Sequence, residues 1–266
     1  MNYIDFRSTL STSWVLFYKD VLVFRSQYFG SVINSLCWLT AVLIPLMFFL
    51  PKMGIQDDFC MFFLPGAVIS WGFFDIIPNA TILVADITGD QSIQYDLILP
   101  VPQWVIFLKI ALTNAYRSIS VSLLMLPVGA TVIYYGKGFV LSQISLPKTA
   151  LILLIGNIFF GFFGLWAASF MNNVGEVRKV WMRILLPLWW IGGFNNSWEV
   201  AYKASPAFAR WMLCNPIIYV LEGMRAAVLG QTGYLPYWKC VVMLSMFSAV
   251  FGLWAIHRLK RRLDCL

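Results

Sequence analysis

The residues that could carry chemistry in this chain are few, and they lie in segments that are otherwise apolar. Asp75 and Arg117 each fall inside a long apolar run. An ionised side chain inside a membrane is costly, so such residues face protein or water and pair with one another. The two residues therefore predict an ion pair between neighbouring spans, with contact to a substrate as the alternative.

The residues that hydrolytic or metal chemistry needs are missing. His257 is the sole histidine and lies in a basic run near the C-terminus, so neither a histidine-based metal site nor a catalytic triad is expected. No GxxxxGK[ST] sequence occurs, which excludes a phosphate-binding loop of that type. The five cysteines include no CxxC pair. We therefore expect no catalytic residue, metal or cofactor in this chain, and a membrane-embedded transferase is the weaker alternative.

The composition identifies the surroundings in which these residues act. Of the 266 residues, 60% are hydrophobic and only 12% are charged, which is too little polar surface for a soluble globule. This predicts an all-α integral membrane protein with a single transmembrane domain over residues 1–266. The net charge of +7 comes from bases at the ends of apolar runs, where they anchor and orient spans, so nucleic acid is not an expected partner.

Six apolar runs predict six transmembrane helices. They cover about 30–50, 59–85, 104–135, 148–170, 184–198 and 237–256, so that 30–198 holds the first five and 257–266 is a basic tail. The fifth is short and contains Pro187 and the Gly192-Gly193 pair. Residues 1–29 mix aromatic and charged side chains, which predicts an interfacial helix. The alternative is that this segment is the ordinary beginning of span 1.

The stretch from 205 to 230 fits neither a membrane span nor a soluble loop. Ser205-Pro206 and Asn215-Pro216 are each a helix start signal, so two short helices are expected. The second helix is too short to cross a bilayer core of about 30 Å. We therefore expect 199–236 to be an external segment whose short helices lie on the outer surface or re-enter the membrane.

A second polar stretch, residues 86–103, separates spans 2 and 3. Its polar residues alternate with apolar ones, and Pro100 and Pro102 end it. We predict a short amphipathic helix on the cytosolic face that docks a partner protein, with a plain polar loop as the alternative. The residues expected in the docking helix are Gln91, Ile93, Gln94, Leu97 and Ile98.

The distribution of bases predicts the orientation. With the N-terminus inside, the cytosolic segments carry more Lys and Arg than the outer ones, which places both termini in the cytosol. The cytosolic bases are Arg7, Lys19, Arg25, Arg178, Lys179, Arg183, Arg258, Lys260, Arg261 and Arg262.

Several segments together resemble the type-2 ABC exporter permease family. They are VFRSQYFGSVIN (23–34), SIQYDLILPVPQWVIFLK (92–109), EVRKVWMRILLPLWWIGGF (176–194) and the stretch 205–230. In the last of these, Asn215, Pro216, Glu222 and Arg225 match the family's NP...E..R pattern. The compact length and the last third are most similar to the permeases that export lipid-linked polysaccharide such as O-antigen, capsule or teichoic acid.

The resemblance implies a function and a set of partners. The chain would be the transmembrane subunit of an ATP-binding cassette exporter in the bacterial cytoplasmic (inner) membrane. Two copies would form a channel at their interface, and two copies of a separate ATPase subunit, which bind ATP and Mg, would dock from the cytosol. The cargo would be a lipid-linked glycan, with a drug or a small lipid as the alternative.

Aromatic residues are abundant, with 22 Phe, 12 Trp and 11 Tyr. Aromatic faces pack well against the C–H faces of sugar rings, so a channel lined by some of them could pass a glycan without tight binding. The alternative is that they belong to the lipid-facing belt and the core. The candidate channel residues are Trp38, Phe73, Phe74, Trp189 and Trp190.

Overall fold

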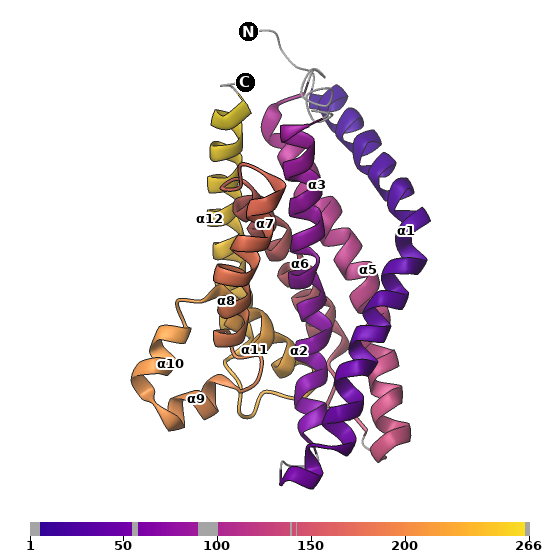
Figure 1. Cartoon of the computed structure of the whole chain (residues 1–266), viewed down its shortest axis with the longest axis vertical. Coiled ribbons are helices and arrows are strands. Elements are labelled where there is room, and N and C mark those ends of the chain that lie inside the picture. The colour runs from indigo at the N-terminus through magenta and orange to yellow at the C-terminus, as the bar shows by residue number, and fades with distance from the viewer. Residues whose placement is uncertain (1–5, 55–57, 90–100, 139, 142, 264–266) are drawn as a thin grey trace.

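The computed structural model describes residues 6–54, 58–89, 101–138, 140–141 and 143–263, and every element in these ranges is a helix, which confirms the all-α prediction. The longer helices run roughly along the long axis of the molecule (Figure 1). The elements are α1 (Phe6–Phe48), η1 (Pro51–Met53), α2 (Phe59–Phe74), α3 (Ile76–Thr88), α5 (Gln103–Lys137), α6 (Leu146–Ala168), α7 (Val174–Val180), the π-helical η2 (Trp181–Leu185), α8 (Leu186–Ile191), α9 (Trp198–Ala204), α10 (Pro206–Met212), α11 (Pro216–Val228) and α12 (Tyr237–Leu263).

Five helical segments within the described ranges are long and apolar enough to cross a membrane, as expected of a multi-pass membrane protein. They are Ser11–Phe48, Phe59–Thr88, Gln103–Lys137, Leu146–Ala168 and Tyr237–Arg262. The predicted fifth span at 184–198 is not among them. In that region α7, η2 and α8 follow one another, and the last of them ends at Ile191. This run also contains four charged residues, Glu176, Arg178, Lys179 and Arg183, which lower its hydropathy.

The predicted interfacial helix and span 1 form one continuous helix, α1. Asp20 on α1 makes an ion pair of 3.1 Å with Lys109 on α5 and accepts a hydrogen bond from Thr113 at 3.4 Å. Lys109 is only 8% exposed. The segment predicted as an interfacial helix is thus continuous with span 1 from Phe6 onward, and at least one of its charges is paired with the neighbouring helix rather than turned toward water.

Helix α6 lies in the middle of the fold and contacts α2, α3, α5, α11 and α12. Glycines on α6 allow neighbouring helices to approach it closely. A Cβ at Gly161 would collide with the backbone carbonyl of Ala111 on α5, and Gly164 lies against Ile76 on α3. The backbones of α5 and α6 therefore touch at Gly161, which sets the spacing of these two helices.

We predict that Gly161→Ala lowers the free energy of unfolding by about 1–3 kcal/mol, because the added methyl group forces α5 and α6 apart. Gly30→Ala is the matched control, since nothing lies within 4 Å of a Cβ at that position. There the loss of a helical glycine should be neutral or stabilising by up to about 1 kcal/mol. Denaturant titration of both variants in one detergent measures the difference, and equal stability would contradict the close contact.

Helix α2 and helix α3 are separated by a break at Asp75. Pro78 has no N–H to donate to the carbonyl of Phe74 four residues earlier, and its ring crowds that carbonyl. The Asp75 amide bonds to the Trp71 carbonyl at 2.9 Å, and the helix begins again at Ile76. The break holds the Asp75 carboxylate near the middle of the second candidate span.

The first turn of α1 and the last turn of α12 lie at the same end of the molecule (Figure 1). There Arg258 donates to the Ser169 carbonyl at 3.2 Å and stacks over the ring of Phe170, and Arg262 donates to the Met171 carbonyl at 2.6 Å. These carbonyls follow the C-terminal end of α6, where cations are favoured. The basic end of α12 is thus fastened to the end of α6.

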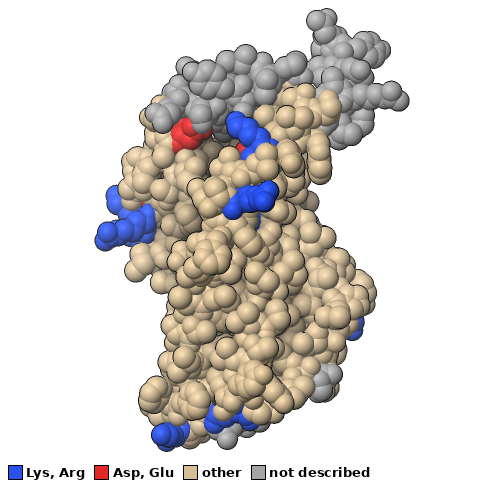
Figure 2. Space-filling model, turned by 90° about the vertical axis from the view of Figure 1, so that its right-hand side faces the viewer, with Lys and Arg blue, Asp and Glu red and all other residues tan. Residues whose placement is uncertain are grey.

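The surface of the molecule agrees with a membrane location. On the face shown in Figure 2, most charged side chains lie toward the two ends, and a broad stretch between them shows almost none. A surface of this kind suits the apolar core of a bilayer, which is about 30 Å thick.

Candidate functional site

Glu222 and Arg225, one turn apart on α11, form a pair that is completely buried. Their nearest charged atoms, Glu222 Oε1 and Arg225 Nη1, are 3.6 Å apart. Arg225 also donates to the carbonyls of Gly193 at 2.7 Å and Phe194 at 2.6 Å, and its guanidinium lies 3.9 Å from the centre of the Phe62 ring. We call Glu222, Arg225 and these contacts the buried clamp.

The Glu222 carboxylate fastens two further segments to α11. Its oxygens accept hydrogen bonds from the Trp198 amide at 3.2 Å and from the Leu235 amide at 3.0 Å. Burial raises the pKa of Glu222, which Arg225 opposes, and burial lowers the pKa of Arg225 to about 10. The guanidinium therefore stays charged at neutral pH. A buried ion pair is tolerated when such additional hydrogen bonds offset the loss of water.

Asn215 and Pro216 set the start of α11. The Asn215 side chain accepts a hydrogen bond from the Ile217 amide at 3.0 Å, and its amide group donates to the Leu188 carbonyl at 2.6 Å. The two helix starts predicted for this stretch are confirmed. Every residue of α11 is buried, however, and α11 lies against α2, α6 and α12 rather than on a surface. The four residues of the NP...E..R pattern thus act inside the protein.

We predict that Glu222→Gln lowers the free energy of unfolding by about 3–5 kcal/mol, because it leaves the buried Arg225 without its counter-charge. Glu199→Gln is the matched control. Glu199 is 43% exposed and pairs with Lys203 one turn later on α9, so its loss should cost no more than about 0.5 kcal/mol. Denaturant titration compares the two, and similar losses would show that the clamp contributes little.

The five aromatic residues predicted from the sequence come together from three elements. Ring centres are 5.1 Å apart for Trp38 and Phe74, 5.2 Å for Phe74 and Trp189, 6.0 Å for Phe73 and Phe74, and 5.5 Å for Trp189 and Trp190. We call these five residues the aromatic row. It runs from α1 across α2 to α8.

The members of the aromatic row differ in exposure. Phe73 and Trp189 are buried, and the indole N–H of Trp189 donates to the Ser70 hydroxyl at 3.0 Å. Trp38 and Phe74 are partly exposed, and Trp190 is 50% exposed. The three accessible rings could contact a ligand, whereas the two buried rings hold them in place.

Phe194 connects the aromatic row to the buried clamp. Its ring centre lies 3.7 Å from that of Trp189, and its carbonyl accepts the hydrogen bond from Arg225. It also contacts Phe63 of α2, with ring centres 4.5 Å apart. The clamp therefore fixes the position of the ring against which Trp189 packs.

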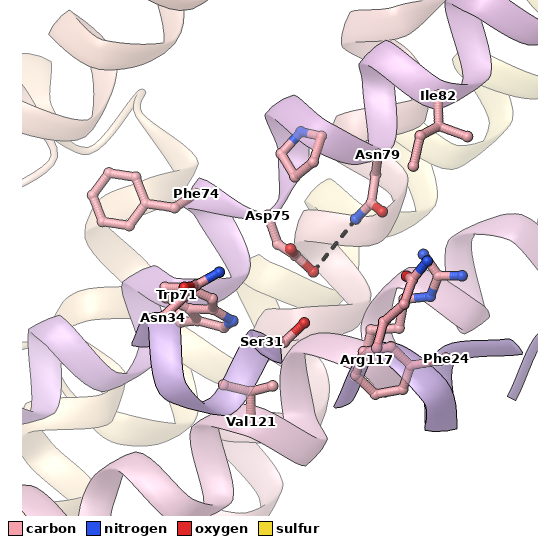
Figure 3. Close-up of a pocket in the computed structure, with 12 residues that line it drawn as sticks. Phe24, Ser31, Asn34, Trp71, Phe74, Asp75, Asn79, Ile82, Arg117 and Val121 are labelled. Carbon is pink, nitrogen blue, oxygen red and sulfur yellow. Dashed lines mark hydrogen bonds between the residues drawn. The ribbon is translucent and has the colours of Figure 1, made fainter. Parts of the chain in front are cut away.

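Asp75 and Arg117 line one pocket of about 290 Å³ between α1, the α2–α3 break and α5 (Figure 3). The Asp75 carboxylate accepts hydrogen bonds from Ser118 at 3.0 Å and Asn79 at 3.5 Å, and the Arg117 guanidinium lies 5.5 Å from the centre of the Phe24 ring. Among the described residues, no salt bridge or hydrogen bond joins Asp75 to Arg117. The two charges share a pocket without direct contact.

Several contacts could not be anticipated from the sequence. The Asp20–Lys109 ion pair was missed, although both residues are charged and lie in or beside apolar runs. Trp181 of η2 also packs against Phe73 and Phe74. The docking-helix residues lie outside the described part of the chain, which leaves that prediction untested. They are Gln91, Ile93, Gln94, Leu97 and Ile98.

Comparisons with protein-family models, with curated proteins and with solved structures gave no match. Within the described ranges, no group of three or more His, Cys, Asp or Glu side chains could hold a metal ion. The aromatic row, the pocket and the apolar helices are therefore the features that bear on function.

Proposed function

We propose that this chain is the transmembrane subunit of an ATP-binding cassette exporter of the type-2 permease kind. It moves a lipid-linked polysaccharide or a related glycolipid across the bacterial inner membrane, and a separate ATPase subunit supplies the energy. The observation that carries this proposal is the aromatic row, because it presents the accessible rings of Trp38 and Phe74 next to each other, with that of Trp190 beyond the buried Trp189, within an apolar, membrane-spanning protein.

Neighbouring aromatic rings suit a polysaccharide that must move along the protein surface. Each aromatic face offers a sugar ring a flat apolar contact, and neighbouring rings offer the next sugar a similar contact. Because Phe73 and Trp189 are packed into the core, the accessible rings are held in fixed positions without depending on the cargo. Such a surface favours movement of a polymer over tight binding.

In this proposal the chain forms half of a dimeric conduit with an even number of membrane passes. In this proposal the run α7, η2 and α8 is the fifth of six passes, and both termini lie in the cytosol. The first turn of α1 and the last turn of α12 share one end of the molecule, as an even number of passes requires (Figure 1). Two copies that face each other through the aromatic row would enclose a channel, and two ATPase subunits would dock on residues 86–103.

Export from membrane vesicles tests the proposal. Vesicles that contain this chain and its ATPase subunit should export a labelled lipid-linked glycan only when ATP and Mg are present. Transport of hydrophobic dyes with no effect of the glycan would instead identify a drug or lipid exporter. Turnover of a substrate by the purified chain without any ATPase would identify an enzyme, and either result overturns the proposal.

We predict that Trp190→Ala lowers the rate of glycan export several-fold while the protein stays folded, because the ring is half-exposed at the end of the aromatic row and only half of it packs against Trp189 and Phe194. Trp211→Ala is the matched control, since Trp211 is 77% exposed on α10, outside the row. Its loss should leave export at the wild-type rate. Equal rates for the two variants would mean that the aromatic row does not touch the cargo.

A further inference from the structure

The pocket beside the aromatic row contains polar groups that the protein itself does not use. Gln27, Ser31 and Asn34 line it from α1, and their spacing of four and three residues places them on one face of that helix. None of these three side chains forms a hydrogen bond with another described residue. Figure 3 shows Ser31 and Asn34 from α1 and Asn79 from α3 gathered around Asp75.

Unused hydrogen-bonding groups within a membrane protein call for a polar occupant. Gln27 and Asn34 are exposed in the structure, so within a bilayer they would face either lipid or an occupant of the pocket. A polar group that loses water without gaining a partner is destabilising, and lipid offers no partner. The Arg117 Nε is also buried without a hydrogen-bond partner in the described structure. Either water or a polar ligand must therefore complete these bonds when the protein lies in a bilayer.

The charges and the ring faces identify the class of ligand. Asp75 would repel a phosphate group, and Arg117 would repel a cation, so a simple ion of either sign is disfavoured. A polyhydroxylated ring accepts hydrogen bonds from the guanidinium and the side-chain amides and donates them to the carboxylate. Trp71 and Phe74 add aromatic surface on the same pocket. The volume of about 290 Å³ is near the lower limit for ligand pockets, about 300 Å³, which fits one sugar residue rather than a polymer.

We propose that this pocket is a subsite for a single sugar residue of the cargo, held by Asn34, Asn79, Asp75 and Arg117 and bordered by Trp71 and Phe74. Phe74 belongs both to the pocket and to the aromatic row, so a sugar that leaves the subsite meets the row at once. This inference rests on the proposed function, because it assigns the place where one ring of the exported glycan is recognised.

Saturation-transfer NMR of the full chain in lipid nanodiscs tests the subsite directly. The probes are methyl α-D-glucopyranoside and methyl α-D-mannopyranoside, with inorganic phosphate and glycerol as competitors, and no sugar-based detergent is used. We expect saturation transfer to the protons of at least one glycoside, and we expect phosphate and glycerol not to displace it. Absence of transfer from the wild-type chain, or displacement by phosphate or glycerol, would overturn the sugar subsite.

Asn34→Leu is the decisive variant, because Asn34 makes no hydrogen bond within the described protein and its loss removes no internal hydrogen bond. Glycoside binding should weaken at least tenfold, with an unchanged thermal midpoint. Asn114→Leu, which replaces a half-buried asparagine on α5 outside the pocket, is the matched control and should bind like the wild type. Equal binding by the two variants would overturn the assignment of the pocket.

The subsite and the proposed export function can fail separately. If ATP-dependent glycan export is observed but Asn34→Leu binds glycosides normally, export stands and the subsite is wrong. If the glycoside binds in a pocket-dependent way but no ATPase energises export, the sugar site stands and the export function is wrong.

Discussion

The structure depends above all on the buried pairing of Glu222 with Arg225. Neither charge reaches water, and together they bind four backbone groups, at Gly193, Phe194, Trp198 and Leu235. These groups belong to the turn after α8, the start of α9 and the loop before α12, which are short segments with little regular structure of their own. Helix α11, whose 13 residues are too few to cross a membrane, thus fixes the positions of these short segments.

The same pairing is connected, through Phe194, to the aromatic surface on which the proposed function rests. Arg225 holds Phe194, Phe194 packs on Trp189, and Trp189 supports the exposed rings of the aromatic row. Helix α2 takes part in both the buried clamp and the polar pocket. Its Phe62 ring lies against the guanidinium of Arg225, while its Trp71 and Phe74 border the pocket. A rigid, charged interior and an accessible aromatic surface are therefore parts of one connected set of contacts.

The sequence predicts much of this fold for identifiable reasons. The helix starts at Pro206 and Pro216 were found because a capping side chain followed by proline is a local signal. The five aromatic residues were named as candidate channel residues from residue type alone. The structure brings their rings into contact, and the channel itself stays a prediction. The continuity of α1 was only the alternative interpretation, and the partners of Arg225 were not predicted. Both depend on contacts between segments far apart in the chain, such as Asp20 with Lys109. The run α7, η2 and α8 carries too many charges to qualify as a candidate span by hydropathy.

Residue-resolved hydrogen exchange of the protein in nanodiscs tests the clamp most directly. Trp198 is the first residue of α9 and Leu235 lies in the loop before α12, and amides at such positions ordinarily exchange fast. Each of these two amides, however, donates to the buried carboxylate of Glu222. The account predicts that both exchange as slowly as the amides within α11. Exchange at the rate of the exposed loop residue Thr232 would contradict the central role of the Glu222–Arg225 pair.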